Sequence, residues 1–238
     1  MSFGVKLFFI LAVITYSFNA MAIQEGSADV TWYEEFFEEK KRQPVEQIIR
    51  VITTRLNKSI EANDATSQAR SLKELALTHL TRTRDYEVAM DYLIECLAIE
   101  DSLDLQEQRI FTYLAMAKVF EEVGNFNKSE QLLEQALAFS RGVDNPHLEV
   151  LVHNELGQIK ASSGKMLEAF NNYDQVLQLK DVIENPKAEA QALFNIGQIY
   201  STQGIYNRAL QNQRSALAIR RAIKDKSKEA VSLNEIGE

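Results

Sequence analysis

The stretch at residues 193–210, LFNIGQIYSTQGIYNRAL, decides the fold that we predict for this chain. Its apolar and small residues recur at the i, i+3, i+4 and i+7 spacing of one helical face: Leu193, Ile196, Gly197 and Tyr200. Gly204 predicts the end of that helix, because a residue without a Cβ adopts a left-handed conformation at little cost. A second helix follows, whose predicted buried stripe comprises Tyr206, Ala209, Leu210, Ala216 and Leu217. The stretch therefore predicts a helical hairpin, and neither helix can bury its stripe alone.

The same hairpin recurs at intervals of forty residues. The position of Gly197 is matched by Leu77, Ala117, Gly157 and Gly237, and the turn at Gly204 by Arg84, Gly124 and Gly164. The position of Tyr206 is matched by Tyr86, Phe126 and Met166, and that of Leu217 by Leu97, Leu137 and Leu177. A fixed period of this size predicts a solenoid of stacked units that share one continuous core.

The units follow from this register. We assign capping helices and a degenerate repeat to residues 23–69, four repeats to 70–109, 110–149, 150–189 and 190–229, and the start of a fifth to 230–238. Of the 238 residues, 45% are apolar, and no segment of useful length has the period of a strand. The predicted fold class is all-α, a solenoid of antiparallel helix hairpins.

The first 22 residues have the layout of a secretory signal peptide. Lys6 precedes an apolar run at residues 7–18, and Ala20 and Ala22 provide the small residues of a cleavage site. The run is shorter than the roughly 20 apolar residues that cross a membrane, although a retained anchor is the alternative. We therefore expect a periplasmic protein that begins at Ile23. The net charge of −8 makes nucleic acid a poor partner, because phosphate contacts need clustered Lys and Arg.

Two segments precede the regular repeats. Residues 29–42 predict a helix whose aromatic residues, Trp32, Tyr33, Phe36 and Phe37, share a face that caps the end of the solenoid. Pro44 ends this helix, and residues 45–60 predict the second helix of a degenerate repeat. Later joints carry Asn145-Pro146 and Asn185-Pro186, a pair that favours the start of a helix.

The motif resembles the tetratricopeptide repeat family. The residues that carry the resemblance are Leu193, Ile196, Gly197, Tyr200, Gly204, Tyr206 and Ala209. The family's usual period is about 34 residues, so these longer units are more similar to the repeats of the maltose-regulon activator and of kinesin light chains. The resemblance extends from residue 70 to the end and implies a right-handed superhelical solenoid. It says little about function, since such repeats are scaffolds for many functions.

No arrangement of residues predicts catalysis. His79, His147 and His153 occupy different repeat positions, and Cys96, the only cysteine, shares its position with small apolar residues. No metal-binding pair of histidines and no glycine-rich phosphate loop is present in the sequence. We therefore predict a protein that is not an enzyme and needs no cofactor or metal.

The resemblance implies that the first helices of successive repeats line a concave groove. It places these residues there: Thr78, Arg82, Lys118, Glu122, Asn154, Gln158, Ser162, Phe194, Gln198 and Thr202. Asn and Gln both donate to and accept from an extended backbone, so the expected partner is a protein or peptide segment. Glu74 and Leu114 stand where members with a carboxylate clamp carry Lys or Asn, which argues against a chaperone tail as ligand. A plain solvated polar face is the alternative.

The end of the chain raises two further expectations. A basic run comprises Arg214, Arg220, Arg221, Lys224, Lys226 and Lys228, and we interpret it as a solvated outer face. Gly237 corresponds to Gly197, so the sequence stops within a first helix, as in a fragment of a longer protein. One hypothesis is a periplasmic protein-binding scaffold. The other is the sensor ectodomain of a diguanylate cyclase or histidine kinase, which would associate with a membrane through a downstream transmembrane segment.

Overall fold

The computed structural model describes residues 44–180 and 182–237, all of which belong to one unit. The expected signal peptide and the aromatic segment at residues 29–42 lie outside the described residues. Every regular element in the described part is helical: α3 (Val45–Glu61), α4 (Ala65–Thr78), a π-helical turn η2 (His79–Thr83), α5 (Tyr86–Ser102), α6 (Gln106–Glu122), α7 (Phe126–Ser140), α8 (Pro146–Ser162), α9 (Met166–Leu179), α10 (Pro186–Thr202), α11 (Tyr206–Ala222) and α12 (Lys226–Ile236). The all-α prediction is confirmed.

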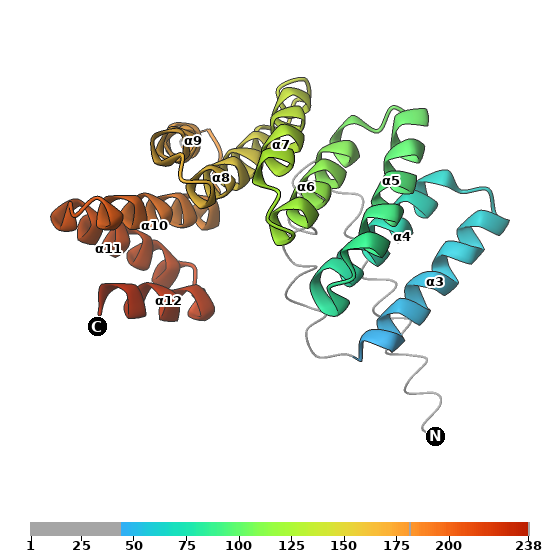
Figure 1. The fold of residues 1–238 in the computed structure, drawn as a ribbon, viewed down its shortest axis with the longest axis horizontal. Coiled ribbons are helices and arrows are strands. Elements are labelled where there is room, and N and C mark those ends of the chain that lie inside the picture. The colour runs from blue at the N-terminus through green and yellow to red at the C-terminus, as the bar shows by residue number, and fades with distance from the viewer. Residues whose placement is uncertain (1–43, 181, 238) are drawn as a thin grey trace. The chain divides into compact units, whose positions relative to one another are not determined.

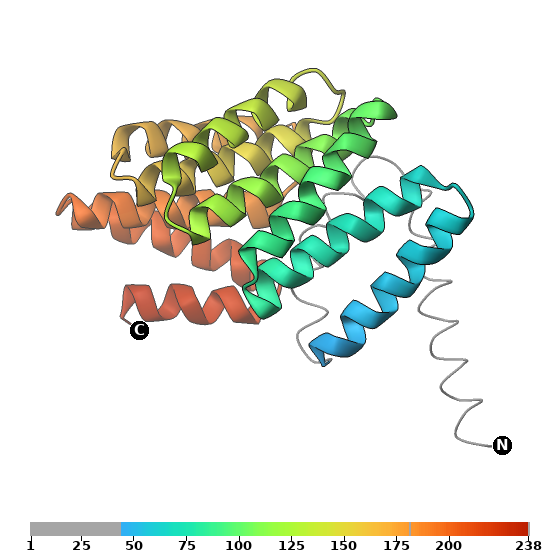
Figure 2. The same cartoon turned by 45° about the vertical axis from the view of Figure 1, so that its right-hand side comes forward.

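The helices alternate between two layers of one solenoid. We call α4, α6, α8, α10 and α12 the first helices, and α3, α5, α7, α9 and α11 the second helices. Each helix packs against the next one along the chain, so the hairpins stack in sequence order (Figures 1 and 2). Successive first helices also contact one another, from α4 to α6 to α8 to α10, more closely than successive second helices do. The more closely spaced row of helices in a curved stack lies on its inner side, which agrees with the predicted position of the first helices.

The hairpin turns repeat one geometry with one exception. Gly124, Gly164 and Gly204 have φ values of 76°, 81° and 74°, in the left-handed region that glycine enters without strain. Arg84 takes the same position at φ 56° and ends the π-helical turn η2. Just before it, Thr81 Oγ1 donates to the Leu77 carbonyl at 2.7 Å. Hydroxyl bonds of this kind loosen a helix, and η2 is the one such turn among the described residues.

The helix starts match the two Asn-Pro joints. Pro146 and Pro186 are the first residues of α8 and α10. Asn185 Oδ1 accepts a capping bond from the Ala188 amide at 3.0 Å, whereas the side chain of Asn145 does not cap its helix. The repeat boundaries at 70, 110, 150, 190 and 230 fall inside the first helices, which begin four or five residues earlier. The forty-residue period is unaffected by this offset.

The core is built largely as the stripe predicts. Ile196 and Gly197 on α10 are buried, and so are Ala209, Ala216 and Leu217 on α11. At the position equivalent to Gly197, Gly157 lies against the ring of Tyr173, which a Cβ would overlap. Glycine therefore allows α8 and α9 to approach closely.

Tyr206 corrects the prediction for the second helix. It was expected in the buried stripe, but 71% of it is exposed. Its counterpart Tyr86 is half-buried, and its hydroxyl donates to Glu122 Oε2 at 3.3 Å, at the end of the next first helix. The same repeat position is therefore half-buried in one repeat and exposed in another.

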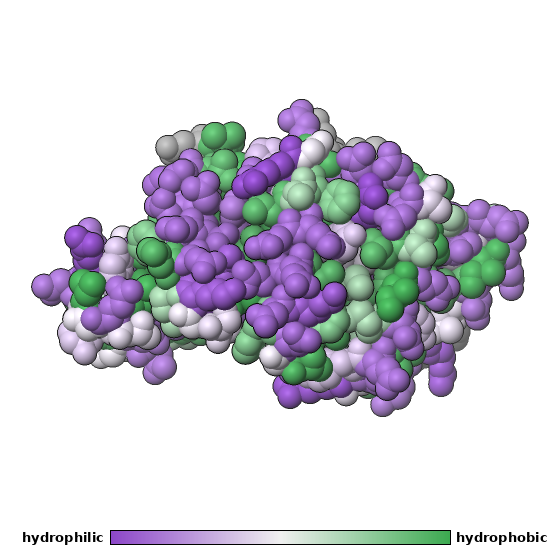
Figure 3. Space-filling view, turned by 45° about the horizontal axis from the view of Figure 1, so that its top comes forward, coloured by the Kyte–Doolittle hydropathy of each residue, from purple (hydrophilic) through white to green (hydrophobic). Residues whose placement is uncertain are grey.

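Two surface features complete the description. Within residues 44–180 and 182–237, no helix combines the length and apolar character needed to cross a membrane. On the face drawn in Figure 3, hydrophilic side chains predominate and hydrophobic ones form separate spots. Recognition on a surface of this kind depends on polar groups and on shape.

Candidate functional site: the first-helix face

Eight of the ten predicted groove residues have exposed surface. Arg82, Lys118, Asn154 and Gln158 are half-buried, and Glu122, Ser162, Gln198 and Thr202 are exposed. All eight lie on the first helices or, for Arg82, on the turn that extends α4. We call the surface that they form the first-helix face.

Thr78 and Phe194, the other two predicted groove residues, are buried. Thr78 is 1% exposed, and its Oγ1 donates to the Glu74 carbonyl at 2.7 Å within α4. Phe194 is 6% exposed because the guanidinium of Arg220 lies over its ring, 4.6 Å from the ring centre. Neither side chain offers the surface that contact with a partner needs.

Arg220 also corrects the interpretation of the basic run. It was expected on a solvated outer face, but it is only 2% exposed. Its Nη1 donates to Ser232 Oγ at 2.6 Å and to the Lys228 carbonyl at 3.2 Å, and its Nη2 donates to Gln191 Oε1 at 3.2 Å. Burial lowers the pKa of the Arg220 guanidinium, and Asp225 partly opposes the change. Arg220 therefore joins α11 to α10 and α12 and is unavailable to an external anion.

The three amides of the predicted groove differ in their surroundings. Gln158 Nε2 on α8 donates to Glu121 Oε1 on α6 at 2.9 Å. The side-chain oxygen of Asn154 is buried, and no donor in the described residues reaches it. Gln198 is exposed on α10. The face thus presents both bound and available amide groups.

Two carboxylates of this face were missed by sequence reasoning. Glu121 Oε2 pairs with Lys118 Nζ at 2.6 Å, one helical turn away on α6. Glu155 on α8 is half-buried, and burial raises the pKa of its carboxyl, with Glu121 adding to the effect and Lys118 opposing it. One signal was present in the sequence. Glu155 occupies a position that holds Leu75, Ala115 and Asn195 in other repeats, so a carboxylate there is unusual.

A polar chain continues beneath this face toward the end of the solenoid. Gln191 Nε2 donates to Asn195 Oδ1 at 2.9 Å, and a side-chain hydrogen bond joins Asn195 to Tyr173. Burial raises the pKa of the Tyr173 hydroxyl, so it remains protonated in neutral solution. Together with the bond from Arg220 to Gln191, this chain links α9, α10 and α11.

The candidate catalytic residues occupy structural positions. Cys96 is fully buried, its Sγ donates to the Ala69 carbonyl at 3.2 Å, and burial raises its pKa to about 12. A thiol of this kind is a poor nucleophile. His153 is buried, with Nδ1 3.0 Å from Asn172 Oδ1 and Nε2 3.7 Å from Glu149 Oε1. In the described part of the chain, no three His, Cys, Asp or Glu residues are grouped to hold a metal ion.

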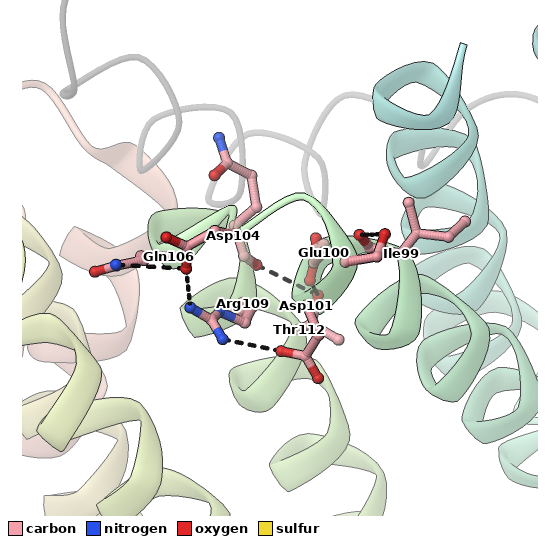
Figure 4. Close-up of polar contacts among 9 residues, drawn as sticks. Ile99, Glu100, Asp101, Asp104, Gln106, Arg109 and Thr112 are labelled. Atoms are coloured by element: carbon pink, nitrogen blue, oxygen red, sulfur yellow. Dashed lines mark hydrogen bonds and ion pairs between the residues drawn. The ribbon is translucent and has the colours of Figure 1, made fainter. Parts of the chain in front are cut away.

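A buried ion pair lies at the other end of the solenoid. Lys73 Nζ on α4 is 2.7 Å from Glu100 Oε1 on α5, and it also donates to the Gln108 carbonyl at 2.8 Å. Glu100 Oε2 accepts a bond from Thr112 Oγ1 on α6 at 2.7 Å (Figure 4). The pair is buried and belongs to the joint between two repeats, so it has no direct role on the first-helix face.

Arg109 stabilises the same joint from the surface. Its guanidinium donates to Asp101 and Asp104, each at 3.0 Å, as Figure 4 shows. It also lies over the ring of Phe139, 4.8 Å from the ring centre. These contacts hold the connection between α5 and α6 against α7.

Comparison with known proteins agrees with the repeat geometry. Residues 148–222 match the family model of the tetratricopeptide repeat. Residues 148–222 therefore carry tetratricopeptide repeats. This match includes the stretch at 193–210 that predicted the fold, and the helix hairpins extend the same forty-residue register from α4 to α12. No curated protein matches the sequence.

Solved structures with tetratricopeptide-like helices share the fold. BtubC (BKLC) from P. vanneervenii has a TM-score of 0.71 and 18% identity, over 82% of each chain. The kinesin light chain repeats of Podosopora anserina have a TM-score of 0.62 and 16% identity, over 82% of this chain and 96% of that one. A Rap protein complexed with Competence and Sporulation Factor has a TM-score of 0.71 and 18% identity, over 90% of this chain and 59% of that one. At these identities the likeness concerns the fold alone.

Proposed function

We propose that this chain is a non-catalytic scaffold, exported to the periplasm, that binds an extended segment of a partner protein across its first-helix face. The observation that carries the proposal is a row of three polar side chains with exposed surface at one repeat position: Lys118 on α6, Gln158 on α8 and Gln198 on α10. A row of this kind meets a linear ligand at regular intervals.

The spacing of the row suits an extended peptide. Packed helices lie about 8–10 Å apart, and an extended chain rises about 3.3 Å per residue. One helix step therefore corresponds to about three peptide residues. Asn and Gln side chains satisfy both the donors and the acceptors of a peptide backbone. The Rap protein with this fold is complexed with Competence and Sporulation Factor, which supports a ligand-binding role for the fold.

A scaffold without catalysis fits the remaining observations. The buried Cys96 has a raised pKa, and His153 is buried beside Asn172 and Glu149. Neither group is placed to act on a bound ligand. Export to the periplasm rests on the sequence of the first 22 residues.

The test measures binding of the purified protein to an array of random peptides of about twelve residues, enough to cross four first helices. The variant replaces the three amides, Asn154, Gln158 and Gln198, by Ala. A matched control replaces three exposed amides of the second helices, Gln131, Gln135 and Gln211, by Ala. We expect the first variant to lose most of its captured peptides, because each lost net hydrogen bond contributes about 0.5–1.5 kcal/mol.

Folding of both variants should be preserved. Gln198 and the three control residues are exposed, and substitutions at exposed sites change the free energy of unfolding by about 0.5 kcal/mol per site or less. Asn154 and Gln158 are half-buried, so chemical denaturation of both variants checks that folding is retained. Unchanged capture by the first variant, with loss in the control, would place the binding surface on the second helices instead. An array that captures nothing would overturn peptide binding altogether.

A further inference from the structure

The middle of the first-helix face carries more negative than positive charge. Lys118, Glu121 and Glu122 lie on the last turns of α6, and Glu155 lies on the neighbouring helix α8. Both oxygens of Glu121 are engaged, Oε2 by Lys118 Nζ at 2.6 Å and Oε1 by Gln158 Nε2 at 2.9 Å. Glu122 is exposed and accepts a bond from the Tyr86 hydroxyl at 3.3 Å. Glu121 thus contacts the ammonium group of Lys118, and Glu122 and Glu155 act on the same group through their charge.

Of the three carboxylates Glu121, Glu122 and Glu155, Glu155 has its negative charge least neutralised by neighbouring groups. Among the described residues it forms no hydrogen bond or ion pair within bonding distance, and Lys118 is the cation that acts on it. Burial by itself lowers the pKa of Lys118, but its bond to Glu121 and the charges of Glu121, Glu155 and Glu122 raise it above its usual value. The ammonium group is thus shared among several carboxylates, and Glu155 keeps unused acceptor capacity.

A second observation points to a missing donor on the same helix. The side-chain oxygen of Asn154, the residue before Glu155, is buried and has no hydrogen-bond donor within the described part of the chain. Buried acceptors of this kind are normally satisfied by a water molecule or a ligand. A group with several N–H donors and a positive charge suits both an amide oxygen that lacks a donor and a carboxylate that is only partly compensated.

We propose that this part of the first-helix face, formed by Lys118, Glu121, Asn154, Glu155 and Gln158, takes a basic side chain, Arg or Lys, of the bound peptide. The proposal rests on the function proposed above and specifies the chemistry of its ligand. Arg suits the place best, because a guanidinium presents five donors in a plane and remains charged.

The structure also confines this specificity to one repeat. The residues equivalent to Glu155 are Leu75 on α4, Ala115 on α6 and Asn195 on α10, and Asn195 is already bonded to Gln191 and Tyr173. An apolar side chain does not attract a cation, and neither does an amide whose hydrogen bonds are already formed within the protein. The bound peptide therefore needs a basic residue at one position only, with its backbone held by the amides of α8 and α10.

The test uses the composition of the peptides that the array captures. The wild-type protein should capture peptides in which Arg and Lys are enriched at one position. Replacing Glu121 and Glu155 by Gln together should reduce that enrichment about tenfold, as expected for a lost charged hydrogen bond. The control, Glu95→Gln with Glu134→Gln, removes two exposed carboxylates from α5 and α7 and should leave the enrichment intact.

Lys118→Met supplies a variant with the opposite expected effect. It removes the cation that competes with the ligand, so the enrichment of Arg and Lys should increase. Capture without enrichment, or enrichment that survives loss of both carboxylates, would overturn the basic subsite. In that case, the variant in which Asn154, Gln158 and Gln198 are replaced by Ala decides about the proposed function. If this variant no longer captures peptides, the protein still binds peptides through the first-helix face. Failure to capture any peptide would overturn the proposed function itself.

Discussion

Glu100 and Arg220 occupy equivalent positions in two repeats that lie 120 residues apart. Each forms a hydrogen bond with a hydroxyl side chain twelve residues later in the sequence, Thr112 or Ser232. Glu100 Oε2 accepts from Thr112 Oγ1 at 2.7 Å, and Arg220 Nη1 donates to Ser232 Oγ at 2.6 Å. Side chains of opposite charge therefore make the same link between a second helix and the next first helix. They differ in how their charge is compensated. Glu100 pairs with Lys73, whereas Arg220 lies over Phe194 and bonds neutral acceptors.

Removing one partner of the buried pair Lys73 and Glu100 should lower the free energy of unfolding strongly, whereas replacing both partners by apolar residues should change it little. Glu100→Gln leaves the Lys73 charge buried without its partner, which costs about 3–5 kcal/mol. The double variant Lys73→Met with Glu100→Leu should recover most of this stability, because it removes both charges. Chemical denaturation measures both. As a surface control, Lys226→Met breaks an exposed bridge to Glu229 and should cost less than about 1 kcal/mol.

Arg220 and Arg221 should differ sharply although they are neighbours of equal charge. Arg220→Met leaves Ser232 Oγ and Gln191 Oε1 without their donor, at about 1–3 kcal/mol for each buried group. Arg221 is exposed and bridges Glu229 at 3.0 Å, so Arg221→Met should cost about 1 kcal/mol or less. Equal free energies of unfolding for the two variants would contradict the buried position of Arg220.

Gly157→Ala should destabilise the protein although Ala is the better helix former. A Cβ there would lie 2.7 Å from Cδ1 and Cζ of the buried Tyr173 ring. Overpacking of this kind costs about 1–3 kcal/mol, more than the gain of up to about 1 kcal/mol in helix propensity. Gly197→Ala should cost less, because its nearest neighbour is Cγ of the flexible Gln213 side chain, at 2.8 Å. Thermal or chemical denaturation measures both variants. A larger loss of stability for Gly197→Ala than for Gly157→Ala would show that the ring of Tyr173 moves aside more easily than the side chain of Gln213.

Glu155→Gln should stabilise the protein in neutral solution and have little effect in acid. Burial raises the pKa of Glu155 in the folded state above its ordinary value of 4.5. A raised pKa means that folding favours the protonated carboxyl, so its contribution is present below 4.5 and is lost as pH rises through the folded pKa. Unfolding of the two proteins at a series of pH values measures the difference.

Export of the chain stays a prediction of the sequence. Lys6, the apolar run at residues 7–18 and the pair Ala20 and Ala22 predict cleavage after residue 22. Expressed in a Gram-negative host, the protein should be recovered from the periplasm with Ile23 as its first residue. The intact mass of the purified protein measures this directly. An uncleaved product in the cytoplasm would refute export.

Much of the fold could be predicted because it depends on local chemistry that repeats. The period of forty residues, the left-handed turns at Gly124, Gly164 and Gly204, and the helix starts at Pro146 and Pro186 all follow from backbone preferences of single residues. The burial of Ile196, Ala209 and Leu217 follows from spacing on a helix. These features need no knowledge of the neighbouring repeat.

The tertiary structure alone decided which polar side chains are buried and which groove residues keep exposed surface. Arg220 was expected to be a solvated charge, and it is buried because the neighbouring helices supply acceptors for its guanidinium. Lys73 is likewise buried, beside the carboxylate of Glu100. Phe194 was expected on the binding face, but it is buried beneath the guanidinium of Arg220. The physical reason is the same in each case. A residue's own chemistry sets what its burial costs, but the partner that offsets this cost lies a whole repeat away, and spacing within one repeat does not reveal it.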